Sequence, residues 1–398
     1  MTQLSTQAIT LPLPSLSPGR ALLIGVIGFL TLVDLFATQA ILPSLAAIYG
    51  VQPSEIGVAA NATTLGMAVA GIVVGAFSAR LERKRAVCLS LALLAIPTTL
   101  LAFAPNLTIF ALLRITQGLF MASAFTLTLT HLAERCERRT ATALAAYVTG
   151  IVASNLIGRL TAAFVAGLVG SESSFIFFAG LNVAGAALVA VALTRNSPEP
   201  AQSPMRFWSA WQHHLADSAL RRTFAIGFLI LFGFIGVFTY VGFVLMRSPH
   251  MLSMGALGLV FLVFLPSMVT TPLAGRVTDR FGPGATLPAS LALALAGLTL
   301  MLLPNLGSIV GGMTLVGIGT FFAQAVATAH VGRVARGDKA AASGLYLSSY
   351  YCGGMAGAAA IGQLFDRFGW TVAIAGVFVA LGLAALLGLK LRVWESQR

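Results

Sequence analysis

A single acidic residue stands in an apolar stretch near the start of the chain. The segment GFLTLVDLFATQAILP, residues 28–43, places Asp34 among side chains that otherwise suit hydrocarbon. A carboxylate in such surroundings is costly unless it pairs with a cation or binds a proton. Arg114 and Arg159 are the two basic residues that also fall inside long apolar stretches. These three residues are the first candidates for charge chemistry, with Asp34 as a proton carrier.

The elements that must position these residues have the composition of a membrane protein. Apolar residues make up 58% of the 398 positions and charged residues 9%, far from the balance of a soluble domain. Windows of about 20 apolar residues, enough to span a bilayer as helices, recur along the whole chain. The fold class predicted is an all-α membrane protein with twelve transmembrane helices. They are expected at 21–43, 55–79, 86–104, 107–131, 142–169, 174–194, 222–247, 253–276, 285–303, 306–331, 341–364 and 369–391.

The distribution of basic residues predicts the orientation of these helices. An even number of spans places both termini on one side, and cytoplasmic loops of membrane proteins are enriched in Lys and Arg. With both termini in the cytoplasm, all but four of the 24 Lys and Arg lie on that side or in the tails. The exceptions are Arg247 and Arg367 outside, and Arg114 and Arg159 within spans. The net charge of +12 therefore reflects topology and does not indicate nucleic-acid binding, and we expect a multi-pass protein of a bacterial inner membrane.

The chain divides into two similar halves. The polar segment 195–221 separates six spans from six, and GAFSARLERK from Gly75 resembles GRVTDRFGPG from Gly275. Parallel repeats of this kind predict two bundles with the substrate path between them. The expected divisions are an N-terminal tail (1–20), a first six-helix bundle (21–194), a cytoplasmic linker (195–221), a second bundle (222–391) and a C-terminal tail (392–398).

Several motifs resemble those of the major facilitator superfamily. ALLRITQGLFMAS, with Arg114, Gln117 and Gly118, is similar to the motif of the fourth span, and the two G-x-x-x-[DA]-R loops resemble the signature loops of the two halves. VDLFATQAILP resembles the Asp-to-Pro motif of the drug:proton antiporter members. YVTGIVASNLIGR and GLYLSSYYCGGMAG resemble segments of the YnfM-type inner-membrane transporters. The resemblance implies two pseudo-symmetric six-helix bundles that work by alternating access.

The resemblance also implies gating roles for the two loops. In the first loop the family aspartate is replaced by Ala79 and the glycine by Glu82, whereas the second loop keeps Asp279, Arg280 and Gly282. The first loop is therefore expected to hold its gating conformation less strongly than the second. The fifth span also lacks the Gly-Pro of the antiporter motif. The gating residues implied are Gly75, Arg80, Arg83, Gly275, Asp279 and Arg280.

The resemblance places Arg114 beside the first span and so suggests a mechanism. Asp34 would be ionised when it faces Arg114 or water and protonated when the bundle closes around it, because burial disfavours the charged form. Arg114 would tune and anchor the carboxylate, with Gln117 hydrogen-bonded nearby. Two other interpretations remain open: Asp34 could be the counter-charge of a cationic substrate, or Asp34 and Arg114 could form a fixed polar clamp.

The substrate path is expected to be mostly neutral and aromatic. The second half has no counterpart of the charge pair, since Phe234 and Thr314 stand 200 residues beyond Asp34 and Arg114. An aromatic wall with a few polar groups suits amphipathic cargo, although helix packing also explains each aromatic residue. Arg159 could extend to the membrane interface, face the cavity and attract an anionic group, or pair with Asp34. The residues expected to line the cavity are Gln39, Asn61, Tyr147, Asn155, Arg159, Phe232, Phe238, Tyr240, Gln324, Tyr346 and Tyr350.

A metal site is a weaker alternative. Met246, His250 and Met254 lie in MRSPHMLSM, and thioether and imidazole ligands suit Cu(I). Pro249 interrupts any helix there, so a methionine-rich rim on an apolar cavity is the favoured interpretation of the pattern. We predict no metal and no cofactor.

The sequence as a whole predicts a secondary active transporter. No G-x-S-x-G, H-E-x-x-H or Walker-type loop is present, so neither an enzyme nor direct use of ATP is expected. The first prediction is proton-coupled antiport that exports small amphipathic organic compounds or drugs, and the alternative is proton-coupled import of a metabolite or a soft metal such as Cu(I). The expected partners are a small-molecule substrate, protons and the lipid bilayer, with no nucleic acid, and the protein is expected to be a monomer.

Overall fold

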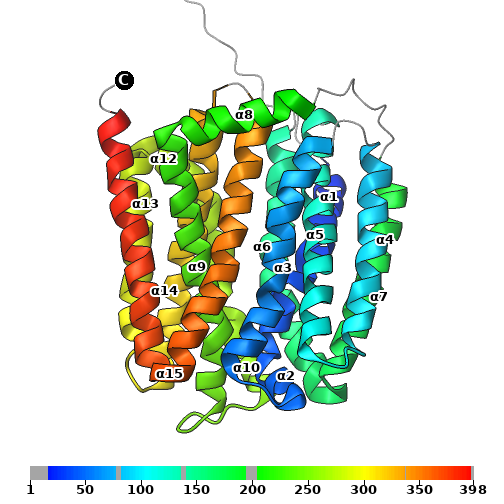
Figure 1. Cartoon of the computed structure of the whole chain (residues 1–398), viewed down its shortest axis with the longest axis vertical. Helices are drawn as coiled ribbons and strands as arrows, with labels where there is room; N and C mark the ends of the chain where they lie inside the picture. Colours follow the sequence, from blue (N-terminus) through cyan, green and yellow to red (C-terminus); the bar gives the residue numbers. More distant parts are fainter. Residues whose placement is uncertain (1–16, 78–81, 136–139, 194–203, 337, 396–398) are drawn as a thin grey trace, which may run out of the picture.

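The computed structural model describes residues 17–77, 82–135, 140–193, 204–336 and 338–395. Within these residues the chain is built of long helices that stand side by side, with one short helix lying across an end of the molecule (Figure 1). The first half comprises α1 (Pro18–Ala40), α2 (Leu42–Tyr49), α3 (Pro53–Phe77), α4 (Arg83–Leu101), α5 (Leu107–Arg135), α6 (Thr140–Val169) and α7 (Ser171–Ala192).

The second half follows a helix in the connecting segment, α8 (Pro204–Ala216), which is the helix that lies across the end of the molecule in Figure 1. Its elements are α9 (Ser218–Met246), α10 (Met254–Val260), η3 (Phe261–Phe264), α11 (Leu265–Thr270), η4 (Thr271–Leu273), α12 (Ala274–Phe281), α13 (Pro283–Leu300), α14 (Leu306–Val334) and α15 (Lys339–Glu395).

These elements make twelve crossings of a membrane. Among the described residues, 11 segments are long and apolar enough to span one, and the last of them, Ala341–Leu391, has 51 residues. At 1.5 Å per residue this segment is about two and a half times as long as a hydrocarbon core is thick, enough for two spans. Gly369 divides it, because its backbone is non-helical (φ 81°, ψ −174°), a conformation that glycine adopts without steric cost. The expected spans 341–364 and 369–391 are therefore both present.

Two expected elements differ in detail. The eighth span, expected as one helix over 253–276, is a chain of short helices that continues to Phe281. Pro266 and Pro272 each stand at the start of one of these pieces, where proline interrupts the helical hydrogen bonds. The expected linker 195–221 contains the helix α8, and α9 begins at Ser218 because the Asp217 side chain accepts hydrogen bonds from the amides of Ala219 and Leu220.

The two halves contact each other at both ends of the molecule, through different elements at each end. We call the end that carries α8 the linker end, and the end that carries α2 and α10 the far end (Figure 1). Helix α3 of the first half packs against α15 of the second. Near the far end the Ser54 amide donates to Asp366 Oδ2 (3.0 Å), and nearer the linker end Ser348 Oγ donates to the Ala68 carbonyl (2.9 Å). The far end is closed further by α6 against α10 and by α2 against α9.

Candidate functional site

Asp34 lies inside the first bundle, where α1, α4 and α7 meet. Its side chain is 3% exposed. Its Oδ2 accepts hydrogen bonds from Asn182 Nδ2 (2.7 Å) on α7 and from Thr98 Oγ1 (3.3 Å) on α4. Its Oδ1 has no hydrogen-bond partner. The carboxyl group is thus held by two neutral side chains through one oxygen, while the other oxygen is unsatisfied.

Arg114 on α5 contacts the backbone around Asp34 rather than the carboxylate itself. Its Nε donates to the Ala60 carbonyl (2.8 Å), and its Nη atoms donate to the carbonyls of Asp34 (3.4 Å) and Leu35 (3.3 Å). Among the described residues no basic side chain lies within the 4.0 Å of an ion pair with the Asp34 carboxylate. Arg114 therefore joins α1 and α3 through their backbones, and the direct contact between the two charged groups that the sequence suggested is not formed.

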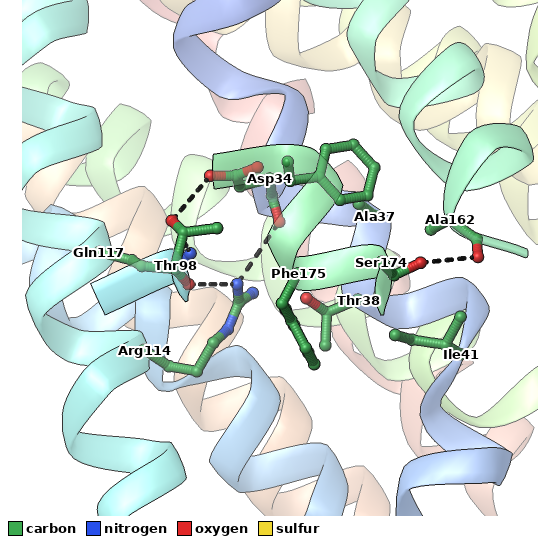
Figure 2. Close-up of a pocket in the computed structure, with 11 residues that line it drawn as sticks. Asp34, Ala37, Thr38, Ile41, Thr98, Arg114, Gln117, Ala162, Ser174 and Phe175 are labelled. Carbon is green, nitrogen blue, oxygen red and sulfur yellow. Dashed lines mark hydrogen bonds between the residues drawn. The ribbon is translucent and has the colours of Figure 1, made fainter. Parts of the chain in front are cut away.

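Gln117 connects the guanidinium to the carboxyl group (Figure 2). Its Oε1 accepts from Arg114 Nη1 (2.7 Å), and its Nε2 donates to Thr98 Oγ1 (2.7 Å), which lies beside Asp34. A cavity of about 10 Å³ adjoins this network, lined by Asp34, Thr98, Arg114 and Gln117 among others. That volume is close to the space needed by one water molecule. The Asp34 carboxyl group therefore lies beside a space of about the size of one water molecule.

A second polar cluster surrounds Arg159 on α6, whose side chain is completely buried. Its Nη1 donates to Asn155 Oδ1 one turn earlier, and its Nη2 donates to Gln39 Oε1 on α1. Because the guanidinium has no exposed surface and its hydrogen bonds go to Asn155 and Gln39, the interpretations in which Arg159 reaches the membrane interface or pairs with Asp34 are wrong. The remaining interpretation, that it faces the path between the bundles and attracts an anionic group, stays a prediction.

Five phenylalanine rings enclose the Arg159 guanidinium. The ring centroids lie 4.5–5.8 Å from its central carbon, within the range of cation–π attraction. One ring belongs to α1 of the first half and the others to α9 and η3 of the second half. The rings are those of Phe36, Phe234, Phe238, Phe261 and Phe264, and we refer to them together as the phenylalanine cage.

A polar contact between the two halves adjoins this cage. Gln39 Nε2 donates to Asn61 Oδ1 (3.3 Å) and to Thr239 Oγ1 (3.4 Å), and Asn61 Nδ2 also donates to Thr239 Oγ1 (3.1 Å). Gln39 and Thr239 stand 200 positions apart, the same offset that relates Gly75 to Gly275. The contact therefore joins equivalent positions of the two repeats, on the far-end side of Asp34.

Comparison with known proteins agrees with this architecture. The sequence profile of the Major Facilitator Superfamily matches residues 24–263 and 242–396. The chain belongs to the major facilitator superfamily. It is therefore a multi-pass membrane transporter of the secondary type, which works by alternating access of two bundles.

Individual members of the superfamily are moderately similar. The inner membrane transport protein YnfM of Escherichia coli is 28% identical over 92% of this chain and 88% of its own length. An uncharacterized transporter of Buchnera aphidicola subsp. Schizaphis graminum is 25% identical, with 92% and 89% covered. Among solved structures, a bacterial homolog of the human lysosomal transporter Spinster, in an inward-facing and unoccupied conformation, superposes with a TM-score of 0.77 at 14% identity over 94% and 97% of the chains. The last comparison concerns the fold alone.

Three residues expected in the cavity of this superfamily member make packing contacts, two of them within their own half and Tyr240 also against Gly57 of α3 in the other half. Tyr147 is fully buried and stacks on Phe125 of α5 at 6.1 Å. The Tyr240 hydroxyl donates to the Ala358 carbonyl of α15 (2.6 Å), and Phe232 stacks on Phe228 of its own helix. These contacts agree with the packing interpretation of each residue, whereas Phe238 belongs to the cage.

Three further cavity residues form a row at the junction of α14 and α15. The Tyr346 hydroxyl donates to Gln324 Oε1 (2.7 Å), and the Tyr350 ring stacks on Tyr346 at 6.3 Å. A cavity of about 600 Å³ at the linker end lies between α3, α8, α9 and α15 and is lined by Trp211, Phe224, Phe228 and Ser348 among others. The Tyr346 ring contacts Phe224 of this lining, with ring centroids 6.5 Å apart.

The residues expected to act in gating, as far as they are described, lie at the linker end. Gly75 is in α3, Arg83 begins α4, and Gly275 is in α12. Asp279 accepts a hydrogen bond from Arg333 of α14 (2.5 Å), while the Arg280 guanidinium lies over the neighbouring Phe281 ring at 5.2 Å. Arg80 lies outside the described residues.

The methionine and histidine residues considered for copper lie at the far end. Met246 ends α9, His250 lies in the connection that follows, and Met254 begins α10. No group of three or more His, Cys, Asp or Glu side chains is placed to hold a metal ion in the part of the chain that is described. Since methionine is not among those four residue types, the copper alternative stays a prediction.

Sequence reasoning missed the closest partners of both charged groups. Thr98 and Asn182 hold Asp34, and Phe36, Phe234, Phe261 and Phe264 complete the cage around Arg159. A signal for Asn182 was available, because it is an amide in the otherwise apolar stretch GLNVAG, and a buried amide needs hydrogen-bond partners. Thr239 could have been found from its 200-residue offset to Gln39. The cage residues carry no comparable signal, since phenylalanine is common in membrane helices.

Proposed function

We propose that this transporter couples proton movement to the export of small amphipathic organic compounds, with Asp34 as the proton carrier. The observation that carries the proposal is the set of unsatisfied groups at Asp34. Asp34 Oδ1 and Asn182 Oδ1 are both buried acceptors without a hydrogen-bond donor. A proton bound to Asp34 Oδ1 would occupy one of these unpartnered atoms and remove a charge from a site without a salt bridge, both of which lower the cost of burial.

Alternating access would complete the cycle. When the bundles open to either side, water would reach the Asp34 cavity and exchange its proton, and when they close, the neutral acid would be favoured. Arg114 and Gln117 would keep the carboxyl group in place throughout the cycle. They donate hydrogen bonds to backbone carbonyls and to Thr98, and not to Asp34 Oδ1, the oxygen that would bind the proton. We further propose that the protein acts as a monomer in the cytoplasmic membrane, with the linker end and both termini in the cytoplasm.

Transport in liposomes tests the proposal. The purified protein is reconstituted, a pH gradient is imposed, and the movement of a panel of amphipathic dyes and drugs is followed. Asp34→Asn should abolish gradient-driven transport while downhill exchange of the same compound continues, because the amide cannot release a proton. Glu172→Gln, a similar change at an exposed acid of α7, is the matched control and should transport normally. Full gradient-driven transport by Asp34→Asn would refute the assignment.

The alternative, proton-coupled import of a metabolite, uses the same Asp34 chemistry. Its supporting observation is Arg159, a positive group between the bundles with only neutral partners. The liposome assay separates the two directions, because the exporter accumulates substrate on the acidic side of the membrane and the importer on the alkaline side. Import of Cu(I) would in addition be lost in Met246→Ala and His250→Ala.

A further inference from the structure

Arg159 is a buried charge without a counter-charge. Its side chain has no exposed surface, and no carboxylate among the described residues lies within 4.0 Å of it. Its hydrogen-bond acceptors are the side-chain oxygens of Asn155 and Gln39, together with the Asn155 carbonyl at 3.4 Å. These oxygens are neutral, and so are the surrounding rings. A guanidinium in such a place is stabilised strongly by any group that brings a negative charge.

The unsatisfied atoms around Arg159 are all donors. Arg159 Nε and Asn155 Nδ2 are both buried without a hydrogen-bond partner. The two residues stand one helical turn apart on α6, and Asn155 already uses its oxygen to accept from Arg159. The orientation of the Asn155 amide is thereby determined, since turning it would place its NH₂ group against the guanidinium. A ligand that satisfies this cluster must bring acceptor oxygens.

The phenylalanine cage limits which anion can bind there. Its five rings offer apolar contact at 4.5–5.8 Å from the guanidinium carbon and no hydrogen bonds to replace lost water. A small, strongly hydrated anion such as phosphate would therefore be disfavoured by its desolvation cost. An anion carried on an aromatic or other apolar body would place its charge on Arg159 and its body among the rings.

We propose that Arg159, Asn155 and the phenylalanine cage form the binding site for an amphipathic organic anion, a carboxylate or sulfonate on an apolar body. This substrate class rests on the proposed transport function and is independent of the direction of transport. Four of the five rings come from the second half of the chain, whereas Arg159, Asn155 and Phe36 come from the first. A ligand held in the cage therefore contacts both bundles. Binding of this ligand changes the free energy of the contact between the two bundles at the far end.

Binding of ring-matched ligands tests the inference. Titration calorimetry on the purified full-length protein compares naphthoate, naphthamide and naphthylmethylammonium, and then the corresponding benzene and indole series. Within at least one ring series the carboxylate should bind about 10-fold or more tightly than its amide, and Arg159→Gln should remove about 10- to 100-fold of that affinity, as expected for a hydrogen-bonded charge pair. The amides should bind equally to both proteins.

The controls separate this inference from a structural role of Arg159. Arg159→Lys keeps the charge and should retain carboxylate binding to within about 10-fold, whereas a purely structural role predicts no preference for carboxylates in any variant. Arg247→Gln, at an exposed arginine over a single phenylalanine ring, should bind as the natural protein does. Elution of each variant as a single folded species is checked first. If Arg159→Gln does not fold, the comparison of carboxylate with amide in the natural protein still decides.

Two results would overturn the inference: carboxylates that bind no better than their amides in all three ring series, or unchanged carboxylate binding by folded Arg159→Gln. Its failure is distinguishable from failure of the proposed function. If carboxylates do not bind but pH-driven transport still depends on Asp34, only the substrate class is wrong. If carboxylates bind through Arg159 while Asp34→Asn retains full pH-driven transport, only the proton carrier is wrong.

Discussion

Asp34, inside the first bundle, and Arg159, between the bundles, have opposite kinds of unsatisfied atoms around them. Around Asp34 the atoms without partners are acceptors, Asp34 Oδ1 and Asn182 Oδ1, and around Arg159 they are donors, Arg159 Nε and Asn155 Nδ2. Buried polar atoms in native structures are nearly always paired, so each exception calls for an explanation. A mobile ligand explains both: a proton at the first site and an anion at the second.

The hydrogen bond between Asn182 and Asp34 leads to a prediction about the pH dependence of transport. Its Nδ2 donates to Asp34 Oδ2 at 2.7 Å, a bond that favours the ionised carboxylate because a carboxylate is the stronger acceptor. In Asn182→Leu the proton should be retained to higher pH, and the midpoint of the pH profile of transport should rise by about 1–2 pH units. Ser174 lines the same cavity, but its hydroxyl donates to the Ala162 carbonyl. The control variant Ser174→Ala should therefore leave the midpoint of the pH profile unchanged. A lower or unchanged midpoint in Asn182→Leu would contradict the role given to this bond.

At the scale of the helix, the sequence was most informative about which segments cross the membrane. Hydropathy windows find spans because every crossing must bury about 20 residues in hydrocarbon, and each expected span corresponds to helical structure. The windows say nothing about which faces meet, so the contact of α4 and α7 at Asp34 through Thr98 and Asn182 was not foreseen. Nor was the short helix α8, whose segment is too polar to count as a span.

The sequence predicted that helices pack closely at glycines, but it did not predict which helices pack against each other. GMAVAGIVVG indicated that helices approach closely at glycine, and a Cβ atom on Gly66 would lie 2.0 Å from the Ile115 carbonyl oxygen of α5. The partner helix α5 contributes Gly118, at which a Cβ would lie 1.9 Å from the Thr63 carbonyl oxygen. Two helices whose backbones touch in this way carry Arg114 and its acceptor Ala60. The positions of the side chains around Asp34 therefore depend on contacts at Gly66 and Gly118. A single sequence does not show that these two glycines lie at the same helix contact.

At the scale of the whole molecule, the far end is where the halves must separate for access from that side. A Cβ atom on Gly258 of α10 would lie 2.7 Å from the Ala163 Cβ of α6, and a small outward shift would bring the pair to the about 3.5–4.5 Å of a disulfide. The double variant Ala163→Cys and Gly258→Cys, with Cys88, Cys136 and Cys352 replaced by Ser, should lose transport on oxidation and regain it on reduction. Each single-cysteine variant should be insensitive to oxidant, and undiminished transport by the fully cross-linked protein would contradict alternating access through this contact.

The most direct test of the central claim is the protonation of Asp34 itself. Infrared difference spectra of the purified protein, recorded while the pH is changed, report the carbonyl stretch of a protonated carboxylic acid separately from the bands of a carboxylate. The other acids also give carboxylic acid bands, so we predict one component of this band that appears and disappears with pH in the natural protein and in Glu172→Gln and that is lost in Asp34→Asn. Spectra of Asp34→Asn that show every pH-dependent component seen in the natural protein would contradict the account.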